Sequence, residues 1–197
     1  MMKTQRYTLK PFLIATLCAL VLSSCGVKKK TTLSQGRGAP SGKVYSDASS
    51  SRGLGKSGHK LANYAAILGV NERELSNKSL YHFIDEWIGS PHRLGGQKKD
   101  GIDCSAFVGM LYSEVYREKL PRSSREMAEN VKRKYENQLK EGDLVFFSFG
   151  GNAIDHVGVY LHNNKFVHVS TKRGVIISDI KDNWYYKYFK RAGTPKS

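Results

Sequence analysis

The spacing of the apolar residues changes near Gly142, and this change limits the possible folds more than any other feature. Before it, apolar residues recur at intervals of three and four, which is typical of helices; after it they alternate, which is typical of strands. Helices first and strands afterwards predict an α+β domain with an antiparallel sheet. We find no internal repeat in this order.

Four helices are expected before Gly142, and capping signals help to place them. Asn77 precedes the second helix, the third begins around Cys104, and Ser123 with Glu126 matches a capping box for a short fourth helix. After Gly142, Asn/Gly turns separate runs rich in β-branched and aromatic residues. The expected strands are 144–149, 156–161, 165–170, 175–180 and a weaker one at 184–191.

Residues 1–24 have the pattern of a secretion signal. A basic start without acidic residues leads into an apolar run at 11–22, and two serines precede Cys25. This run is shorter than the roughly 18 residues that span a bilayer. The sequence ending at Cys25 resembles a bacterial lipobox, so we expect Cys25 to carry the lipid anchor; the alternative is an ordinary secreted protein.

The next segment, 25–60, is expected to be a flexible basic tether behind the lipidated cysteine. Glycine and serine are frequent in it and Tyr45 is its one aromatic residue, so it offers little apolar surface to offset the entropy of ordering. An ordered extension is the alternative. Residues 61–197 then form the expected domain. Two acyl chains on Cys25 would make the attachment to the membrane stable.

The formal net charge of +15 first suggests a nucleic-acid-binding protein. Ten of these fifteen charges, however, lie in residues 1–60, within the signal and the tether. Residues 61–197 are only mildly basic and contain no recognised nucleic-acid motif, so we expect no nucleic-acid partner. The charge of the tether suits an anionic lipid surface or an acidic wall polymer.

Cysteine use leaves one thiol to explain. Cys18 lies in the signal and Cys25 would carry lipid, so Cys104 has no disulfide partner within the domain. It follows Asp103 at a predicted helix start, where the helix dipole favours the thiolate and predicts a lowered thiol pKa. The alternative is a structural cysteine, because cysteines are commonly buried.

His156 and His168 lie on consecutive predicted strands. If the valines of both strands share one face, both histidines lie on the other, which requires a turn of odd length such as 162–164. A two-residue turn would place the histidines on opposite faces. A thiol at the helix start could then face two imidazoles, an arrangement that supplies a nucleophile, a base and an orienting group. A zinc site with the same three residues is the alternative.

Six short motifs occur in order over about residues 80–191. They are Gly95-Gly96, Gly101-Ile102-Asp103-Cys104-Ser105, Leu120-Pro121-Arg122, Gly142-Asp143-Leu144-Val145-Phe146-Phe147, His156-Val157-Gly158-Val159-Tyr160 and Phe166-Val167-His168. This order resembles the NlpC-type family of papain-like cell-wall cysteine peptidases. Together with the lipoprotein signal, it resembles lipid-anchored murein endopeptidases of Gram-negative bacteria. The resemblance implies a papain-like fold in which N-terminal helices pack on a five- to six-stranded antiparallel sheet.

The same resemblance implies a role for each candidate residue. Cys104 would be the nucleophile, His156 the general base and His168 the group that orients His156. The substrate would be the stem peptides of peptidoglycan, cut between D-glutamate and diaminopimelate or at a diaminopimelate cross-link. No cofactor and no metal are implied. A binding module without catalysis on the same fold and a thiol acyltransferase are the competing functions.

The resemblance also implies a substrate cleft lined by Asp103 and Ser105. His92 stands where the family usually has a tyrosine, and it could replace that tyrosine as a hydrogen-bond donor or remain a solvated loop residue. We expect a monomer, held at the outer membrane and facing the periplasm. Gly26 weakly favours that membrane, because it lacks the aspartate that retains some lipoproteins at the inner membrane.

Overall fold

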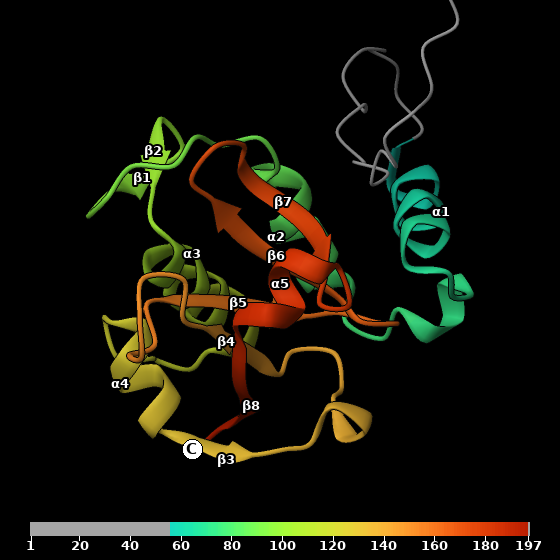
Figure 1. Ribbon diagram of the computed structural model, residues 1–197. Helices are drawn as coiled ribbons and strands as arrows, with labels where there is room; N and C mark the ends of the chain where they lie inside the picture. Colours follow the sequence, from blue (N-terminus) through green and yellow to red (C-terminus); the bar gives the residue numbers. More distant parts are fainter. Residues whose placement is uncertain (1–55, 197) are drawn as a thin grey trace, which may run out of the picture. The chain divides into compact units, whose positions relative to one another are not determined.

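A computed structural model describes residues 56–196 (Figure 1). The predicted signal at 1–24, the predicted lipid anchor Cys25 and most of the predicted tether lie outside the described residues. The first helix, α1, begins at Lys56, five residues before the expected domain boundary at 61. Within the described part of the chain, no helix combines the length and the apolar character needed to cross a membrane.

The four helices expected before Gly142 are present, and their caps form as the sequence indicates. The Asn77 side chain accepts a hydrogen bond from the Leu80 amide at 3.1 Å, and Ser123 and Glu126 form a capping box. Two short helical segments, η1 and η2, lie between these helices, and a third, η3, follows α4. The helical elements are α1 (Lys56–Leu68), η1 (Glu72–Glu74), α2 (Lys78–Trp87), α3 (Cys104–Leu111), η2 (Tyr112–Tyr116, a π-helical segment), α4 (Ser124–Glu129), η3 (Glu136–Gln138) and α5 (Asn183–Tyr188).

The strands form a six-stranded, wholly antiparallel sheet in the order β3-β8-β4-β5-β6-β7, and β1 and β2 form a separate small hairpin. The α+β, papain-like fold class that the sequence predicted is therefore confirmed. The strands are β1 (Gln97–Lys98), β2 (Gly101–Ile102), β3 (Val131–Arg133), β4 (Leu144–Phe147), β5 (His156–Tyr160), β6 (Lys165–Ser170), β7 (Gly174–Asp179) and β8 (Phe189–Pro195).

The large sheet has two different faces. The first, called the valine face, packs with residues of α1 to α4 into the main apolar core; it consists of Leu144, Phe146, Val157, Val159, Val167, Val169 and Val175. The second, called the histidine face, is covered by α5 and by aromatic side chains. Figure 1 shows α5 and α3 on opposite sides of β5 and β6. The histidine face consists of Val145, Phe147, His156, Tyr160, Phe166 and His168.

The strand predicted at 184–191 is wrong over most of its length. This segment begins as helix α5, and the strand β8 starts only at Phe189. The reason lies at Asp182, whose side chain accepts the Trp184 amide at 2.9 Å and caps the helix. Helical spacing then directs Tyr185 and Tyr188 toward the histidine face, while Trp184 stays 58% exposed.

The turn between β5 and β6 has the predicted odd length. The Leu161 amide donates to the Lys165 carbonyl at 2.8 Å, which closes a three-residue turn at 162–164. Asn163 and Asn164 adopt positive φ values of 49° and 62°, which asparagine tolerates better than most residues. This length keeps His156 and His168 on one face of the sheet.

Candidate active site

Asp103 fixes the start of α3. Its carboxylate accepts hydrogen bonds from the Ala106 amide at 2.7 Å, the Ser105 hydroxyl at 3.0 Å and both terminal nitrogens of Arg122 at 3.1 and 2.7 Å. Burial alone would raise the pKa of Asp103, but the Arg122 guanidinium and the two other donors hold that pKa below its usual value. Both carboxylate oxygens are therefore engaged by the protein itself, next to Cys104.

Cys104 meets the sheet where two strands separate. The ladder between β5 and β6 ends at the pair Gly158–His168, and the Val157 amide just beyond it lowers the pKa of the Cys104 thiol. Because α3 packs on the valine face, the thiol reaches this point from the side opposite the imidazoles. α3, which begins at Cys104, packs against β5 and β6, the strands that carry His156 and His168.

The thiol pKa differs from the sequence-based expectation. Burial raises the pKa of Cys104 to about 11, and the neighbouring Asp103 carboxylate raises it further, while the Val157 amide lowers it. The prediction of a lowered pKa at the helix start was wrong for this resting structure. Desolvation of a part-buried sulfur outweighs the partial charge of the helix N-terminus. The thiol is therefore neutral at rest and needs a base.

The two histidines are joined directly. His156 Nε2 and His168 Nδ1 are 2.9 Å apart, with the rings nearly perpendicular at 86°. Gly158 lies between them on the same face of β5, and a Cβ there would come within 2.7 Å of Phe166 and 3.1 Å of the His168 Cβ. The glycine thus makes room for the pair. His156 Nδ1 is the ring nitrogen that does not contact His168.

Aromatic packing keeps both imidazoles neutral. His168 stacks on Phe166 with ring centroids 4.7 Å apart, and His156 lies beside Phe149 at 5.3 Å. Burial lowers the pKa of His156 to about 4. Burial likewise lowers the pKa of His168 well below its usual value, as does the charge that His156 would carry. An unprotonated His156 is the form that accepts a proton.

Two partners of His168 were missed by the sequence reasoning. Its Nε2 lies 3.0 Å from Ser178 Oγ and 3.2 Å from the Tyr185 hydroxyl. Ser178 pairs with Phe166 across β6 and β7, so it shares the histidine face. The alternation of β7 could have placed Ser178 there, whereas Tyr185 depends on α5, which the strand prediction excluded.

The other predicted site residues are Ser105, which follows Cys104 on α3, and His92, in the loop before β1. His92 forms an isolated β-bridge with Ile102. A positive charge on His92 would lower the pKa of His156, so the two rings are near enough to interact electrostatically. The Ser105 hydroxyl accepts a hydrogen bond from Arg122 at 2.8 Å. The surroundings of Cys104 therefore bring together the predicted residues of α3, β5 and the loop before β1.

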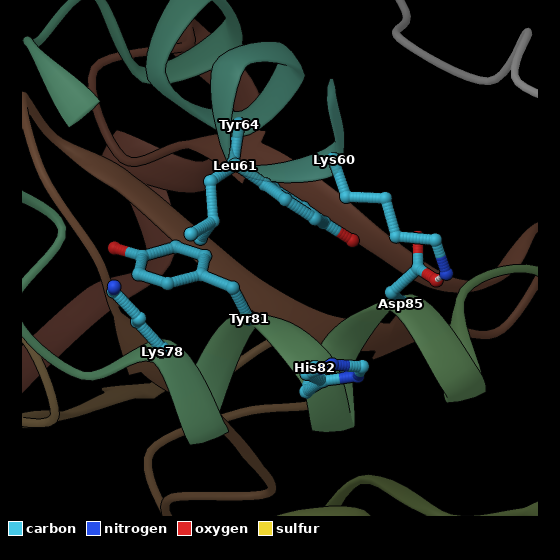
Figure 2. A pocket seen from close by; sticks show the side chains of 7 residues that line it. All are labelled: Lys60, Leu61, Tyr64, Lys78, Tyr81, His82 and Asp85. Carbon is cyan, nitrogen blue, oxygen red and sulfur yellow. Dashed lines mark hydrogen bonds and ion pairs between the residues drawn. The ribbon is translucent and has the colours of Figure 1, made fainter. Parts of the chain in front are cut away.

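A small cavity of about 20 Å³ lies between α1 and α2 and is lined by none of these site residues (Figure 2). Tyr64 and Tyr81 approach each other there, and Lys60 pairs with Asp85, so the cavity is a gap in helix packing. A wider groove of about 1160 Å³ includes Ser178 and Tyr185 in its walls. Among residues 56–196, no group of three or more His, Cys, Asp or Glu side chains is placed to hold a metal ion.

Comparison with curated proteins finds relatives that act on the cell wall. The chain is 40% identical over 118 residues to a "Probable endopeptidase NlpC homolog" of Haemophilus influenzae, covering 60% of this chain and 62% of that protein. It is also 40% identical over 123 residues to "Murein DD-endopeptidase MepS/Murein LD-carboxypeptidase" of Escherichia coli K12, covering 62% and 64%. The match therefore spans somewhat less than two thirds of these relatives.

Solved structures agree on the fold. An NlpC/P60 family protein from Bacillus cereus superposes with a TM-score of 0.56 at 24% identity, over 61% of this chain and 40% of that one. The NlpC/P60 domain of the peptidoglycan hydrolase SagA gives 0.52 at 22% identity, over 60% and 98%. The NlpC/P60 family profile matches residues 89–194, which include Cys104, His156 and His168. The chain belongs to the NlpC/P60 family.

Proposed function

We propose that this protein is a murein endopeptidase that cleaves stem peptides by thiol catalysis. The observation that carries the proposal is the 2.9 Å contact between two buried histidines on strands that pack against α3, the helix that Cys104 begins. The family membership and the murein endopeptidases among the relatives support it. Cys104 acts as nucleophile, His156 as general base and His168 as the residue that orients His156.

The reaction begins with proton transfer from the Cys104 thiol to His156 Nδ1. The thiolate attacks the carbonyl carbon of the scissile bond, and the backbone N–H of Cys104 at the start of α3 donates to the oxyanion that forms. His156 then gives the proton to the leaving amine, and a thioester remains on Cys104. Water, deprotonated by His156, releases the second product and restores the thiol. The raised pKa of Cys104 makes this base essential.

The substrate side of the proposal concerns Asp103, Ser105 and His92. Asp103 and Ser105 line the cleft together with Arg122, which both of them hold in place. His92, close to His156, donates to the substrate where the family usually has a tyrosine. The bond cut lies between D-glutamate and diaminopimelate, or at a diaminopimelate cross-link.

The location of the protein is part of the same proposal. Murein lies in the cell envelope, so the enzyme works there, with Cys25 lipidated and the basic segment between Cys25 and α1 as its tether. The anchor is in the outer membrane and faces the periplasm, and the enzyme acts as a monomer without a cofactor.

Digestion of purified murein tests this function. The full-length wild type should release soluble muropeptides, and their masses should identify the bond that is cut. Cys104→Ala should lower the rate by about 10⁶-fold, because removal of a nucleophile leaves only binding and the oxyanion hole. Equal thermal unfolding of the two proteins is the control. Murein binding without release by the wild type would indicate a binding module, and acyl transfer from phospholipid would indicate a transferase.

A further inference from the structure

Nε2 of His168, the ring nitrogen that does not contact His156, faces two hydroxyl groups. Its Nε2 lies 3.0 Å from Ser178 Oγ on β7 and 3.2 Å from the Tyr185 hydroxyl on α5. His168 itself is only 1% exposed, so water has little access to that nitrogen. The hydroxyl groups therefore take the place that solvent would occupy around an exposed ring.

The direction of these hydrogen bonds decides which nitrogen of His156 is free. A neutral imidazole carries one proton, so a proton on His168 Nε2 leaves Nδ1 as an acceptor. His156 must then carry its own proton on Nε2 to complete the 2.9 Å contact. Its Nδ1 is left without a proton, and only this tautomer can accept the proton of Cys104.

The opposite arrangement would stop the reaction. A proton on His168 Nδ1 would be donated to His156 Nε2, and the proton of His156 would then sit on Nδ1, facing the thiol. Both arrangements satisfy the contact between the two rings equally well. The groups around His168 Nε2 therefore select between an active and an inactive tautomer.

On the basis of the proposed function, we propose that Ser178 and Tyr185 are positioning residues that hold the His168 proton on Nε2 and thereby keep His156 Nδ1 free. The Ser178 hydroxyl donates to the Tyr185 oxygen at 3.4 Å, so the lone pairs of Ser178 point to the imidazole. An acceptor at Nε2 favours a proton there.

Tyr185 also holds the ring of His168 in place. The two rings lie at 78° with centroids 5.2 Å apart, and Tyr185 packs in the same way on Phe166 at 5.2 Å and 84°. Removing its hydroxyl alone keeps these ring contacts. Tyr185→Phe therefore separates the hydrogen bond from the packing, and Ser178→Ala removes the second hydroxyl at little cost in volume.

Kinetics on murein is the first test. The double variant S178A/Y185F should lower kcat by about tenfold or more, the scale on which partners that orient a histidine act, with KM unchanged. Each single variant should lose less, because one hydroxyl group remains at Nε2. Ser178→Thr keeps a hydroxyl group, so the variant S178T/Y185F should recover the activity that S178A/Y185F loses. Tyr186→Phe removes the hydroxyl of an adjacent, half-exposed tyrosine on α5 and serves as the matched control.

The tautomer itself can be measured without any activity. Nitrogen-15 NMR of the full-length protein distinguishes protonated from unprotonated ring nitrogens. The wild type should show protonated Nε2 and unprotonated Nδ1 in both His156 and His168. In the double variant, a population protonated at His156 Nδ1 should appear, while Tyr186→Phe keeps the wild-type spectrum.

The outcomes separate this proposal from the proposed function. A wild type that releases no muropeptides contradicts the function, and the NMR spectra then decide the tautomer by themselves. An active wild type with unchanged kcat in the double variant overturns the proposal. A loss of kcat with unaltered tautomers overturns it too, because the hydroxyl groups would then act only through packing.

Discussion

The two faces of the central sheet bury different kinds of side chain. The valine face is aliphatic and packs against α1 to α4, whereas the histidine face buries two imidazoles among aromatic rings beneath α5. Burying aliphatic groups stabilises the fold at any pH, but burying a titratable group does so only while it remains neutral. The strands thus carry stability on one side and chemistry on the other.

His156 and Val157 are neighbours on β5 and show this division within two residues. Their side chains project to opposite faces: Val157 packs in the main apolar core, and His156 contacts His168 and Phe149. Because successive side chains on a strand point to opposite faces, one strand can place an apolar side chain on one face and a titratable one on the other. Substitutions on each face should therefore produce different defects.

The largest effect is expected for His156→Gln. Loss of the base should lower the rate of murein cleavage by about 10⁶-fold, because the neutral thiol then has no proton acceptor. Release of muropeptides measures this rate. Retention of more than a tenth of the activity, in a variant that unfolds at the same temperature, would show that another group takes the proton.

The second prediction concerns the stability of the protein at acidic pH. Because the pKa of His156 in the fold is about 4, below the usual 6.5, the unfolded chain takes up the proton first as the pH falls. Stability should be unaffected by this group above pH 6.5 and should fall by about 3 kcal/mol between pH 6.5 and 4. Urea unfolding at several pH values measures it. His156→Gln should flatten this slope, and an unchanged slope would contradict a buried neutral His156.

Val167→Ala tests the valine face, at the residue that precedes His168 on β6. Loss of two buried methyl groups should destabilise the protein by about 2 kcal/mol, equally at pH 7.5 and pH 5, with little change in kcat. Urea unfolding and muropeptide release are the measurements. A pH-dependent loss of stability, or a large loss of kcat, would mean that the two faces are coupled.

The smallest effect is expected for Asp103→Asn. Asparagine can still cap α3, so the loss is mainly that of the charge paired with Arg122, whose side chain is 49% exposed. We expect a destabilisation of about 1 kcal/mol, lost below the lowered pKa of Asp103. Thermal unfolding at neutral and acidic pH measures it. A loss of several kcal/mol would show that the cleft depends on this ion pair.

Sequence reasoning could predict the features that depend on local rules. The caps at Asn77 and Ser123 follow from short side-chain contacts, and the odd turn at 162–164 follows from strand alternation. The shared face of His156 and His168 follows from the same alternation, and the 2.9 Å contact is its consequence.

The features that depend on tertiary packing could not be predicted in this way. Aromatic residues in α5 have high strand propensity, but the Asp182 cap and the fit of Tyr185 against the histidine face decide for a helix. The pKa of Cys104 was misjudged because burial depends on how α3 meets β5, which a helix dipole alone does not describe. The partnership of His168 with Ser178 and Tyr185 was missed for the same reason.

The three-residue turn after β5 has a consequence for length variation among relatives of this chain. Lengthening or shortening it by one residue would move His168 to the opposite side of β6, into the aliphatic core, and would bring Val167 beneath α5. A change of two residues would leave every side chain on its present side. Insertions and deletions at this turn that preserve activity should therefore come in even numbers, a parity rule that aligned sequences can test.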